Sequence, residues 1–232
     1  MVPIPINDHI RRRIFWAATL LLIVVNTMAF MFELSLGYQL NRFIFYFSII
    51  PARYTAPHTV ASPEGFLVPV FASMFLHGGW LHLLGNMLFL FVFGRSVEDR
   101  YGHAKFLLIY FLSGLAAAIT HIYFNAGSRL PTIGASGAIA GILGAYFVCF
   151  PGARITTLIP FIFFFWRVEI PAVFILGYWF LLQFLSGMDP TNMAGTQGGV
   201  AVWAHVGGFI AGMVLAFALT PRRPRVEVLP PY

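Results

Sequence analysis

Long apolar stretches alternate along the chain with short segments that contain charges, glycine and proline. Six of these stretches approach the ~20 residues that a helix needs to cross the hydrocarbon core of a bilayer. The pattern therefore predicts an all-α membrane protein, a bundle of six transmembrane helices. The predicted spans are residues 14–32, the part of 65–94 from about Trp80 onward, 106–124, a helix within 130–150, about 170–186 and about 199–220.

The segments outside these spans complete the predicted organisation. Residues 1–13 form an N-terminal extension, residues 14–220 one membrane domain, and residues 221–232 a disordered tail rich in proline and arginine. The apolar run at 43–50 is too short to cross a bilayer and is interpreted as an interfacial or re-entrant segment. The glycine-rich stretch 187–199 is typical of a mobile loop or cap.

Composition supports the membrane class. Hydrophobic residues make up 59% of the chain and charged residues only 9%, and the mean hydropathy is +0.82. A soluble domain of this length needs more charge on its surface, whereas lipid-facing helices are apolar on every side. The single cysteine, Cys149, lies in an apolar run and is expected to pack as a small hydrophobic residue.

The basic residues predict how the spans are oriented. Six spans place both termini on one side, and cytoplasmic loops normally carry an excess of lysine and arginine. With cytoplasmic termini, the inner side holds Arg11, Arg12, Arg13, Arg95, Arg100, Lys105, Arg154, Arg167, Arg222, Arg223 and Arg225. The outer side then holds only Arg42, Arg53 and Arg129. We therefore expect cytoplasmic termini, and this scatter over short loops indicates membrane topology rather than a nucleic-acid partner.

Four polar side chains inside the predicted spans are the candidates for chemistry, because a polar group in hydrocarbon needs a partner or a function. Ser136 lies near the start of the fourth span and His205 near the start of the sixth. His82 and Asn86 lie four residues apart on one face of the second span. Each has a structural alternative, since such residues often only hydrogen-bond to a helix. The three spans run in the same direction, which predicts that all four residues lie at a similar depth near the outer surface.

Small residues predict close packing of the fourth and sixth spans. The stripes are Gly137, Gly141 and Gly144 on the fourth span, and Gly208 and Gly212 on the sixth. Such stripes let two helix backbones approach closely. We therefore expect Ser136 to lie within hydrogen-bonding reach of His205.

A serine hydroxyl beside an imidazole is the minimum arrangement for nucleophilic acyl transfer. The acidic residues all lie at span ends or in loops, which favours a Ser–His dyad over a triad. The backbone N–H of Ser136 and the side chains of His82 and Asn86 are the predicted donors to the developing oxyanion. The chain contains neither HExxH nor the histidine repeats of a di-iron membrane oxidase, so no metal and no cofactor is expected.

Three motifs, in order on the second, fourth and sixth predicted spans, resemble the rhomboid family of intramembrane serine proteases. They are HGGWLHLLGNMLFLFVFGRSVEDRYG at 77–102, GASGAIAG at 134–141 and AHVGGFIAG at 204–212. The resemblance implies that Ser136 is the nucleophile and His205 the general base, with His82, Asn86 and the Ser136 amide around the oxyanion hole. It implies a structural role for Glu98. Structural or interfacial roles are also expected for the remaining histidines, His9, His58, His77, His103 and His121.

The resemblance also implies a substrate and a location. The expected partners are the lipid bilayer and single-span membrane proteins, which are cut within or beside their transmembrane segment. The fifth span would be a lateral gate and the 187–199 loop a lid. The expected location is the inner membrane of a bacterium, with the active site open to the outer side. Two departures from the family pattern stand out: Ala140 replaces a tyrosine that packs against the histidine in some rhomboids, and the Trp-Arg pair of the outer loop is absent.

Two other classes of protein remain as alternatives. A catalytically inactive rhomboid-like chaperone or adaptor would share the fold, but such proteins typically lack the serine or the histidine. A small polytopic transporter would be expected to show paired intramembrane charges or repeat symmetry, and the sequence has neither.

Overall fold

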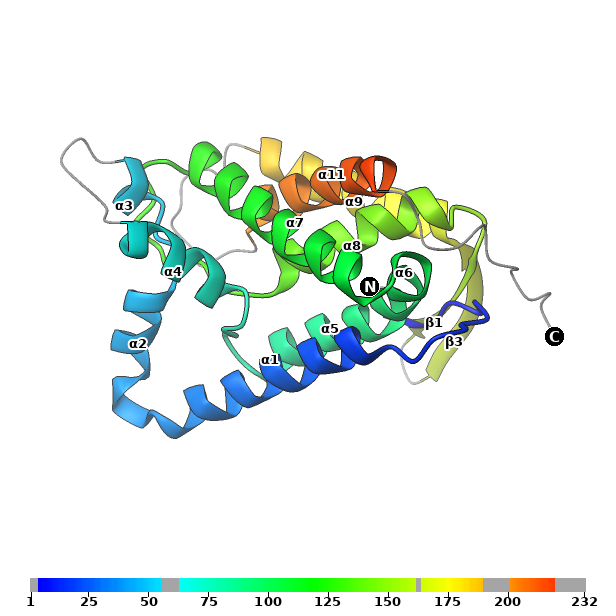
Figure 1. The fold of residues 1–232 in the computed structure, drawn as a ribbon, viewed down its shortest axis with the longest axis horizontal. Helices are drawn as coiled ribbons and strands as arrows, with labels where there is room; N and C mark the ends of the chain where they lie inside the picture. The colour runs from blue at the N-terminus through cyan, green and yellow to red at the C-terminus, as the bar shows by residue number, and fades with distance from the viewer. Residues whose placement is uncertain (1–3, 56–62, 162–163, 190–200, 220–232) are drawn as a thin grey trace.

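The computed structural model describes residues 4–55, 63–161, 164–189 and 201–219. Figure 1 shows an elongated bundle in which α7, α8, α9 and α11 lie along one side and α1 and α5 along the other. The helices are α1 (Ala17–Ser35), α2 (Leu40–Phe47), α3 (Ala52–Thr55), α4 (Pro63–Ser73), α5 (Trp80–Phe89), α6 (Arg95–Tyr101), α7 (His103–Phe124), α8 (Ser136–Cys149), α9 (Ala172–Met188) and α11 (Val202–Ala218). A 3₁₀ turn, η1 (Gly37–Gln39), follows α1, and a π-helical segment, η2 (Leu90–Gly94), joins α5 to α6. The strands are β1 (Ile4–Asn7), β2 (Arg154–Phe161) and β3 (Phe164–Pro171).

Each predicted span contains a helix. Among the described residues, three helical segments are long and apolar enough to cross a membrane: α1, the run from Trp80 to Tyr101, and α7. The other three, α8, α9 and α11, are shorter apolar helices. A helix of 17 residues, the length of α9 and α11, is about 26 Å long, somewhat less than the roughly 30 Å hydrocarbon core. The mostly helical membrane bundle is thus confirmed, while the count of six spans stays a prediction.

Helix α8 lies at the centre of the bundle, packed against α7 and α11 (Figure 1). Every residue from Gly137 to Tyr146 is buried. A helix that is apolar on all sides has no reason to face solvent, and its small residues let neighbouring helices surround it. Because of this central position, the start of α8 at Ser136 lies among the surrounding helices.

Glycines bring the backbones of α8 and α11 into direct contact. A Cβ added to Gly208 would overlap the carbonyl oxygen of Gly137, and one added to Gly212 would overlap that of Gly141. Gly144 lies in the same way against the carbonyl of Phe209. No residue larger than glycine fits at these positions while the helices keep this separation.

Two buried carboxylates of α6 hold the N-terminal end of α1. Glu98 accepts hydrogen bonds from the backbone N–H groups of Ala18 and Thr19 at 2.8 and 2.7 Å, and from the Thr19 hydroxyl at 2.6 Å. Asp99 accepts two more from backbone N–H groups just before the helix. The first N–H groups of a helix lack intrahelical partners, and α1 has no side-chain cap of its own. Glu98 therefore caps α1 from another helix, which is a structural role.

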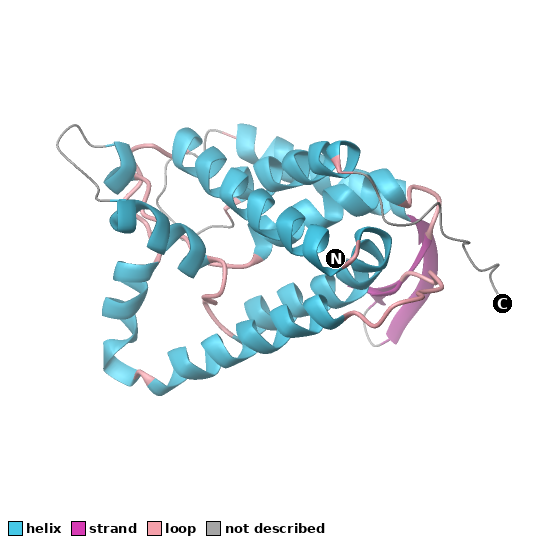
Figure 2. Ribbon diagram, in the orientation of Figure 1, coloured by secondary structure: helices cyan, strands magenta, loops and turns pink. Residues whose placement is uncertain are grey.

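A three-stranded antiparallel sheet covers one end of the bundle (Figure 2). β1 lies in the predicted N-terminal extension and pairs with β2, and β2 pairs with β3 as a hairpin. The all-α prediction is therefore incomplete, because the β-branched and aromatic residues of 154–171 pair as strands. The predicted start of the fifth helix is also corrected: Ile170 and Pro171 lie in β3, and α9 begins at Ala172. Pro171, with φ −57° and ψ 138°, has no N–H for a further ladder bond and leads directly into the helix.

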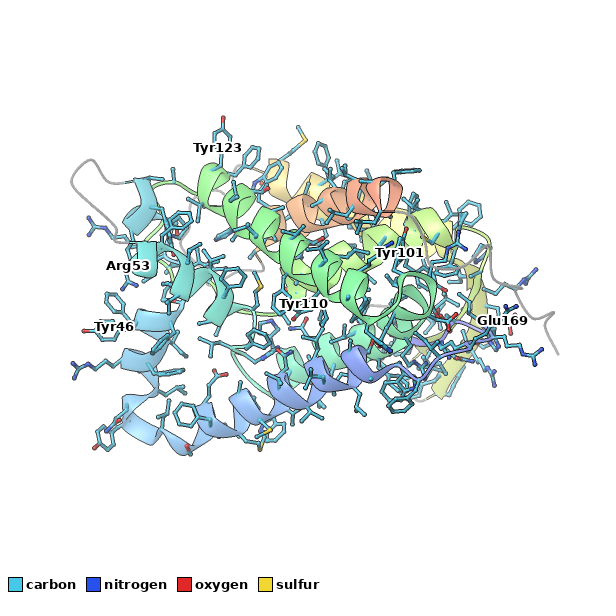
Figure 3. The ribbon with its side chains drawn as sticks, viewed as in Figure 1. Tyr46, Arg53, Tyr101, Tyr110, Tyr123 and Glu169 are labelled. Atoms are coloured by element: carbon cyan, nitrogen blue, oxygen red, sulfur yellow. The ribbon has the colours of Figure 1, made fainter. Side chains whose placement is uncertain are left out.

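The opposite end of the bundle is formed by η1, α2, α3 and α4 (Figure 1). Most of the run at 43–50 belongs to α2, and Ile49 forms an isolated β-bridge with Thr132. Figure 3 shows Tyr46, Arg53 and Tyr123 at this end and Glu169 at the sheet end. Most of the predicted lid at 187–199, and the predicted tail at 221–232, lie outside the described residues.

Candidate active site

Ser136 and His205 are hydrogen-bonded to each other across two helices. Nε2 of His205 lies 2.8 Å from Oγ of Ser136, although the residues are 69 positions apart in the sequence. Ser136 is the first residue of α8, and His205 lies in the first turn of α11. The contact of Gly208 with the Gly137 carbonyl lies within one turn of this pair, so the close approach of the two helices sets the distance between Oγ and Nε2.

The surroundings of the pair suit a general base. The imidazole of His205 is only 7% exposed, whereas Ser136 is half-buried and open to one side. With the serine hydroxyl donating to Nε2, the imidazole is placed to take the hydroxyl proton when Oγ attacks a carbonyl. The geometry is therefore that of an assembled nucleophile and base.

His82 lies next to the same point, on α5. The backbone N–H of Gly78 donates to Nδ1 of His82 at 3.3 Å, so the neutral ring carries its proton on Nε2. A Cβ built on Gly134 would lie 2.7 Å from His82 Nε2 and 3.5 Å from Ser136 Oγ. Both atoms therefore border the space that a side chain at position 134 would fill, and φ +134° also favours glycine there. The Nε2–H group of His82 is a hydrogen-bond donor close to the serine.

Asn86 follows His82 by one helical turn on the same face of α5. Its side chain is buried, with 8% of the residue exposed. Within the described part of the chain, Nδ2 of Asn86 has no hydrogen-bond partner. A buried amide N–H without an acceptor costs free energy unless a ligand supplies one. This donor has the character expected of an oxyanion-hole group.

The turn that precedes Ser136 is fastened on two sides. The N–H of Gly134 donates to the carbonyl of Ser73 at 2.8 Å, which ties the turn to the end of α4. Thr132 is held by the β-bridge to Ile49 and by a contact of 2.8 Å between its Oγ1 and Nε2 of His121 on α7. The start of α8, and with it Ser136, is thereby fixed relative to the rest of the bundle.

Comparison with known proteins identifies the family. Residues 64–222, more than half of the chain, match the family model described as the Rhomboid domain. The chain belongs to the rhomboid family. Its membership and its apolar helices make it an integral membrane protein.

Curated relatives come from bacteria, plants and yeast. Rhomboid protease AarA of Providencia stuartii is 33% identical over 172 residues, which are 68% of this chain and 58% of that protein. RHOMBOID-like protein 5 of Arabidopsis thaliana is 30% identical over 172 residues, 73% of this chain and 49% of that protein. Rhomboid protein 1, mitochondrial, of Saccharomyces cerevisiae is 28% identical over 157 residues, 66% of this chain and 42% of that protein. This rhomboid thus spans about half the length of the curated relatives it matches.

A small cavity adjoins Ser136 in this rhomboid. It lies between α4, α7 and α8, and has room for one or a few water molecules. Its polar lining includes Ser73, His121, Thr132 and Ser136. Water in this cavity would therefore lie next to Ser136.

Helix α9 supplies two contacts to His205 that the sequence did not identify. Nδ1 of His205 lies 2.9 Å from Oε1 of Gln183. The ring of Trp179, one turn earlier on α9, lies beside the imidazole with 5.7 Å between ring centroids and 36° between planes. These two residues brace the histidine where Ala140 leaves it without a tyrosine neighbour. The sequence feature that could have indicated this contact is Gln183 itself, because it is an amide within a largely apolar helix.

Other histidines in the described residues contact structural partners. His9 contacts Thr156, His77 the backbone carbonyl of Phe75, His103 the carboxylate of Glu98, and His121 the hydroxyl of Thr132. His58 lies outside the described residues.

Proposed function

We propose that this rhomboid is an intramembrane serine endopeptidase with a Ser136–His205 dyad. The observation that carries the proposal is the 2.8 Å contact between His205 Nε2 and Ser136 Oγ, in a chain that belongs to a family with proteolytic members. The protonated Nε2–H of His82 and the unpartnered amide of Asn86 lie on the adjoining helix face and support it.

The residues divide the reaction as follows. His205 takes the proton from Ser136 as Oγ attacks the scissile carbonyl carbon, and the carbonyl oxygen becomes an oxyanion. The backbone N–H of Ser136, at the start of α8, and the side chains of His82 and Asn86 donate to that oxygen. His205 then gives its proton to the leaving amine. A water molecule hydrolyses the acyl-enzyme with His205 again as base, which regenerates the serine.

The proposed function also covers the substrates of the enzyme and its orientation in the membrane. Substrates are single-span membrane proteins, cut in or beside the membrane segment where small or helix-breaking residues allow the helix to unwind. The chain crosses the inner membrane of a bacterium six times with both termini in the cytoplasm, and the active site opens to the outer side. The distribution of arginine and lysine supports this orientation. The segment 187–199 acts as a lid over the site and α9 as a lateral gate.

The test uses purified protein in proteoliposomes with a model single-span substrate. We expect the wild type to cleave it in the presence of a metal chelator, and Ser136→Ala and His205→Ala each to abolish cleavage. Ser35→Ala is the matched control, because Ser35 is exposed at the end of α1 and its hydroxyl donates to the carbonyl of Phe32 in its own helix. A serine-directed fluorophosphonate should label the wild type and not Ser136→Ala.

Two outcomes would overturn the proposal. Retained cleavage by Ser136→Ala would remove the nucleophile assignment. A folded wild type that binds single-span proteins, cleaves none of them and takes no fluorophosphonate would indicate an inactive adaptor.

A further inference from the structure

We propose that Gln183 is a positioning residue for the catalytic base: through its Oε1 it fixes the tautomer and the ring orientation of His205. This inference rests on the proposed function and adds a third polar member to the dyad. The contact is 2.9 Å between Gln183 Oε1 and Nδ1 of His205, on the ring edge opposite the Ser136 contact.

The tautomer follows from what each partner can offer. For Nε2 to accept the proton of the Ser136 hydroxyl, it must be unprotonated, so a neutral ring carries its proton on Nδ1. Oε1 of an amide has lone pairs and accepts that Nδ1–H. The opposite tautomer would place a proton between Nε2 and Oγ, and two acceptors, Nδ1 and Oε1, would then face each other at 2.9 Å. An amide keeps this arrangement without placing a negative charge in the membrane, where an unpaired carboxylate is costly.

The ring orientation is set by two residues of one helix face. Trp179 and Gln183 lie four positions apart on α9, so Trp179 packs beside the imidazole while Gln183 holds its edge. Gln183 is half-buried, whereas Leu182, the preceding residue, is exposed on the outside of the helix. The titratable groups that face His205 from other elements are His82 on α5 and His121 on α7. No carboxylate in the described residues contacts its Nδ1, so the amide of Gln183 takes the place that a carboxylate has in a triad.

The test compares two variants of Gln183 in proteoliposomes. Gln183→Met keeps the size and removes the acceptor, and we expect kcat to fall by about 10- to 100-fold with KM little changed. Gln183→Glu restores an acceptor, and we expect it to recover most of kcat. It should also move the acid limb of the kcat/KM profile to higher pH, because a carboxylate beside Nδ1 stabilises the protonated ring. Val214→Ala is the control, because its side chain is 60% exposed on α11, outside the proposed gate.

The readouts separate this inference from a general packing role and from the proposed function. A packing role would lower thermal stability and leave the acid limb in place, and Glu would not rescue. The inference is overturned if Gln183→Met keeps the wild-type kcat, or if the acid limb of Gln183→Glu coincides with that of the wild type. The proposed function fails by a different result, namely cleavage by Ser136→Ala.

A second observation concerns the sheet, and it does not depend on catalysis. The β2–β3 hairpin has a polar base and an apolar outer half. At the base, Arg154 pairs with Glu169 at 4.0 Å, and Thr156 contacts His9 at 2.5 Å. In the outer half, Phe164, Phe165 and Trp166 follow one another and are 57, 61 and 63% exposed. Successive strand residues point to opposite faces, so this part of the hairpin is apolar on both sides.

We infer that the outer half of this hairpin lies in the membrane, at the headgroup level of the leaflet on the sheet side. Three successive aromatic side chains that are each more than half exposed are unfavourable in water, whereas tryptophan is enriched at the membrane interface. Arg167 follows Trp166 and is suited to anionic lipid headgroups. The start of α1 lies at the same end of the bundle as the sheet (Figure 1). Phe15, just before α1, is also 64% exposed and contacts the ring of Trp16.

Single-cysteine labelling tests this placement, because Cys149 is the only native cysteine. In a Cys149→Ala background, an environment-sensitive fluorophore is attached at Phe165→Cys, and at Gly152→Cys as the control in the exposed turn before β2. In proteoliposomes we expect the label at 165 to emit at shorter wavelength and to be quenched by lipids with a shallow spin label. Equal water exposure of the two labels overturns the inference. Protection that appears only at high protein-to-lipid ratio, and disappears on dilution with lipid, also overturns it and identifies a second copy of the chain as the partner.

Discussion

Gly212→Ala tests whether the separation of α8 and α11 controls the catalytic pair. The new Cβ would lie 2.5 Å from the carbonyl carbon of Gly141 and 2.6 Å from its Cα, whereas ordinary contact begins at 3.4 Å. It would also overlap the carbonyl oxygen of Gly141, which lies closer still. Backbone cannot swing aside as a side chain can, so the helices must separate by at least about 1 Å at this point, at an overpacking cost of about 1–3 kcal/mol.

The separation reaches the active site because the same two helices carry its residues. Gly212 is about two turns beyond His205 on α11. A rigid displacement of about 1 Å along the line that joins His205 Nε2 and Ser136 Oγ would lengthen their contact from 2.8 Å to roughly 3.8 Å. That distance is beyond the range of a hydrogen bond. Since a misplacement of this size costs up to about 100-fold in rate, we expect kcat for a single-span substrate to fall by about 10- to 100-fold.

The assay measures cleavage in proteoliposomes per folded enzyme, with folding checked by thermal unfolding in detergent. Gly177→Ala on α9 is the matched control: its Cβ would meet Phe147 at 3.7 Å, an ordinary contact, and its rate should stay within about twofold of the wild type. A Gly212→Ala enzyme that is folded and as fast as the wild type would refute the reasoning, because the dyad would then tolerate a wider helix pair.

Three further predictions follow from contacts elsewhere in the structure. Asn86→Ala and His82→Ala should each lower kcat by about 10- to 1000-fold with a smaller change in KM, since each removes one oxyanion donor; an unchanged kcat for both would contradict the assigned oxyanion hole. Glu98→Gln should lower the free energy of unfolding by about 2–3 kcal/mol, measured by steady-state unfolding in detergent. The two carboxylate oxygens of Glu98 accept three hydrogen bonds from Ala18 and Thr19, whereas an amide has only one acceptor oxygen. Gly134→Ala should inactivate the enzyme, because φ +134° is unfavourable for alanine and its Cβ would lie 2.7 Å from His82 Nε2; fluorophosphonate labelling at the wild-type rate would speak against this.

The polar residues of the site could be predicted from the sequence because each stands out against an apolar span. Ser136, His205, His82 and Asn86 were visible in this way, and the glycine stripes indicated which helices approach each other. Gln183 also stands out as a polar residue. Its partner could not be predicted, because α9 is apolar on nearly every face and its periodicity does not say which face points inward.

The sheet shows a different limit of the hydrophobic pattern. Residues 155–166 form a nearly continuous apolar run, which a buried helix and a strand share. The pairing of β2 with β1 depends on contacts between Ile4 and Leu158, far apart in the sequence, which no local pattern records. The cap that Glu98 gives to α1 is hidden for the same reason, since its acceptor and donors are about 80 residues apart.

The imidazole of His205 belongs to α11, but its two nitrogens contact side chains of two other helices, α8 and α9. The proposed catalytic base therefore keeps both contacts only while three helices hold their mutual positions, and a shift of any one of them breaks a contact. In the proposed protease, any change in the packing of α8, α9 or α11 would therefore also change the state of the base.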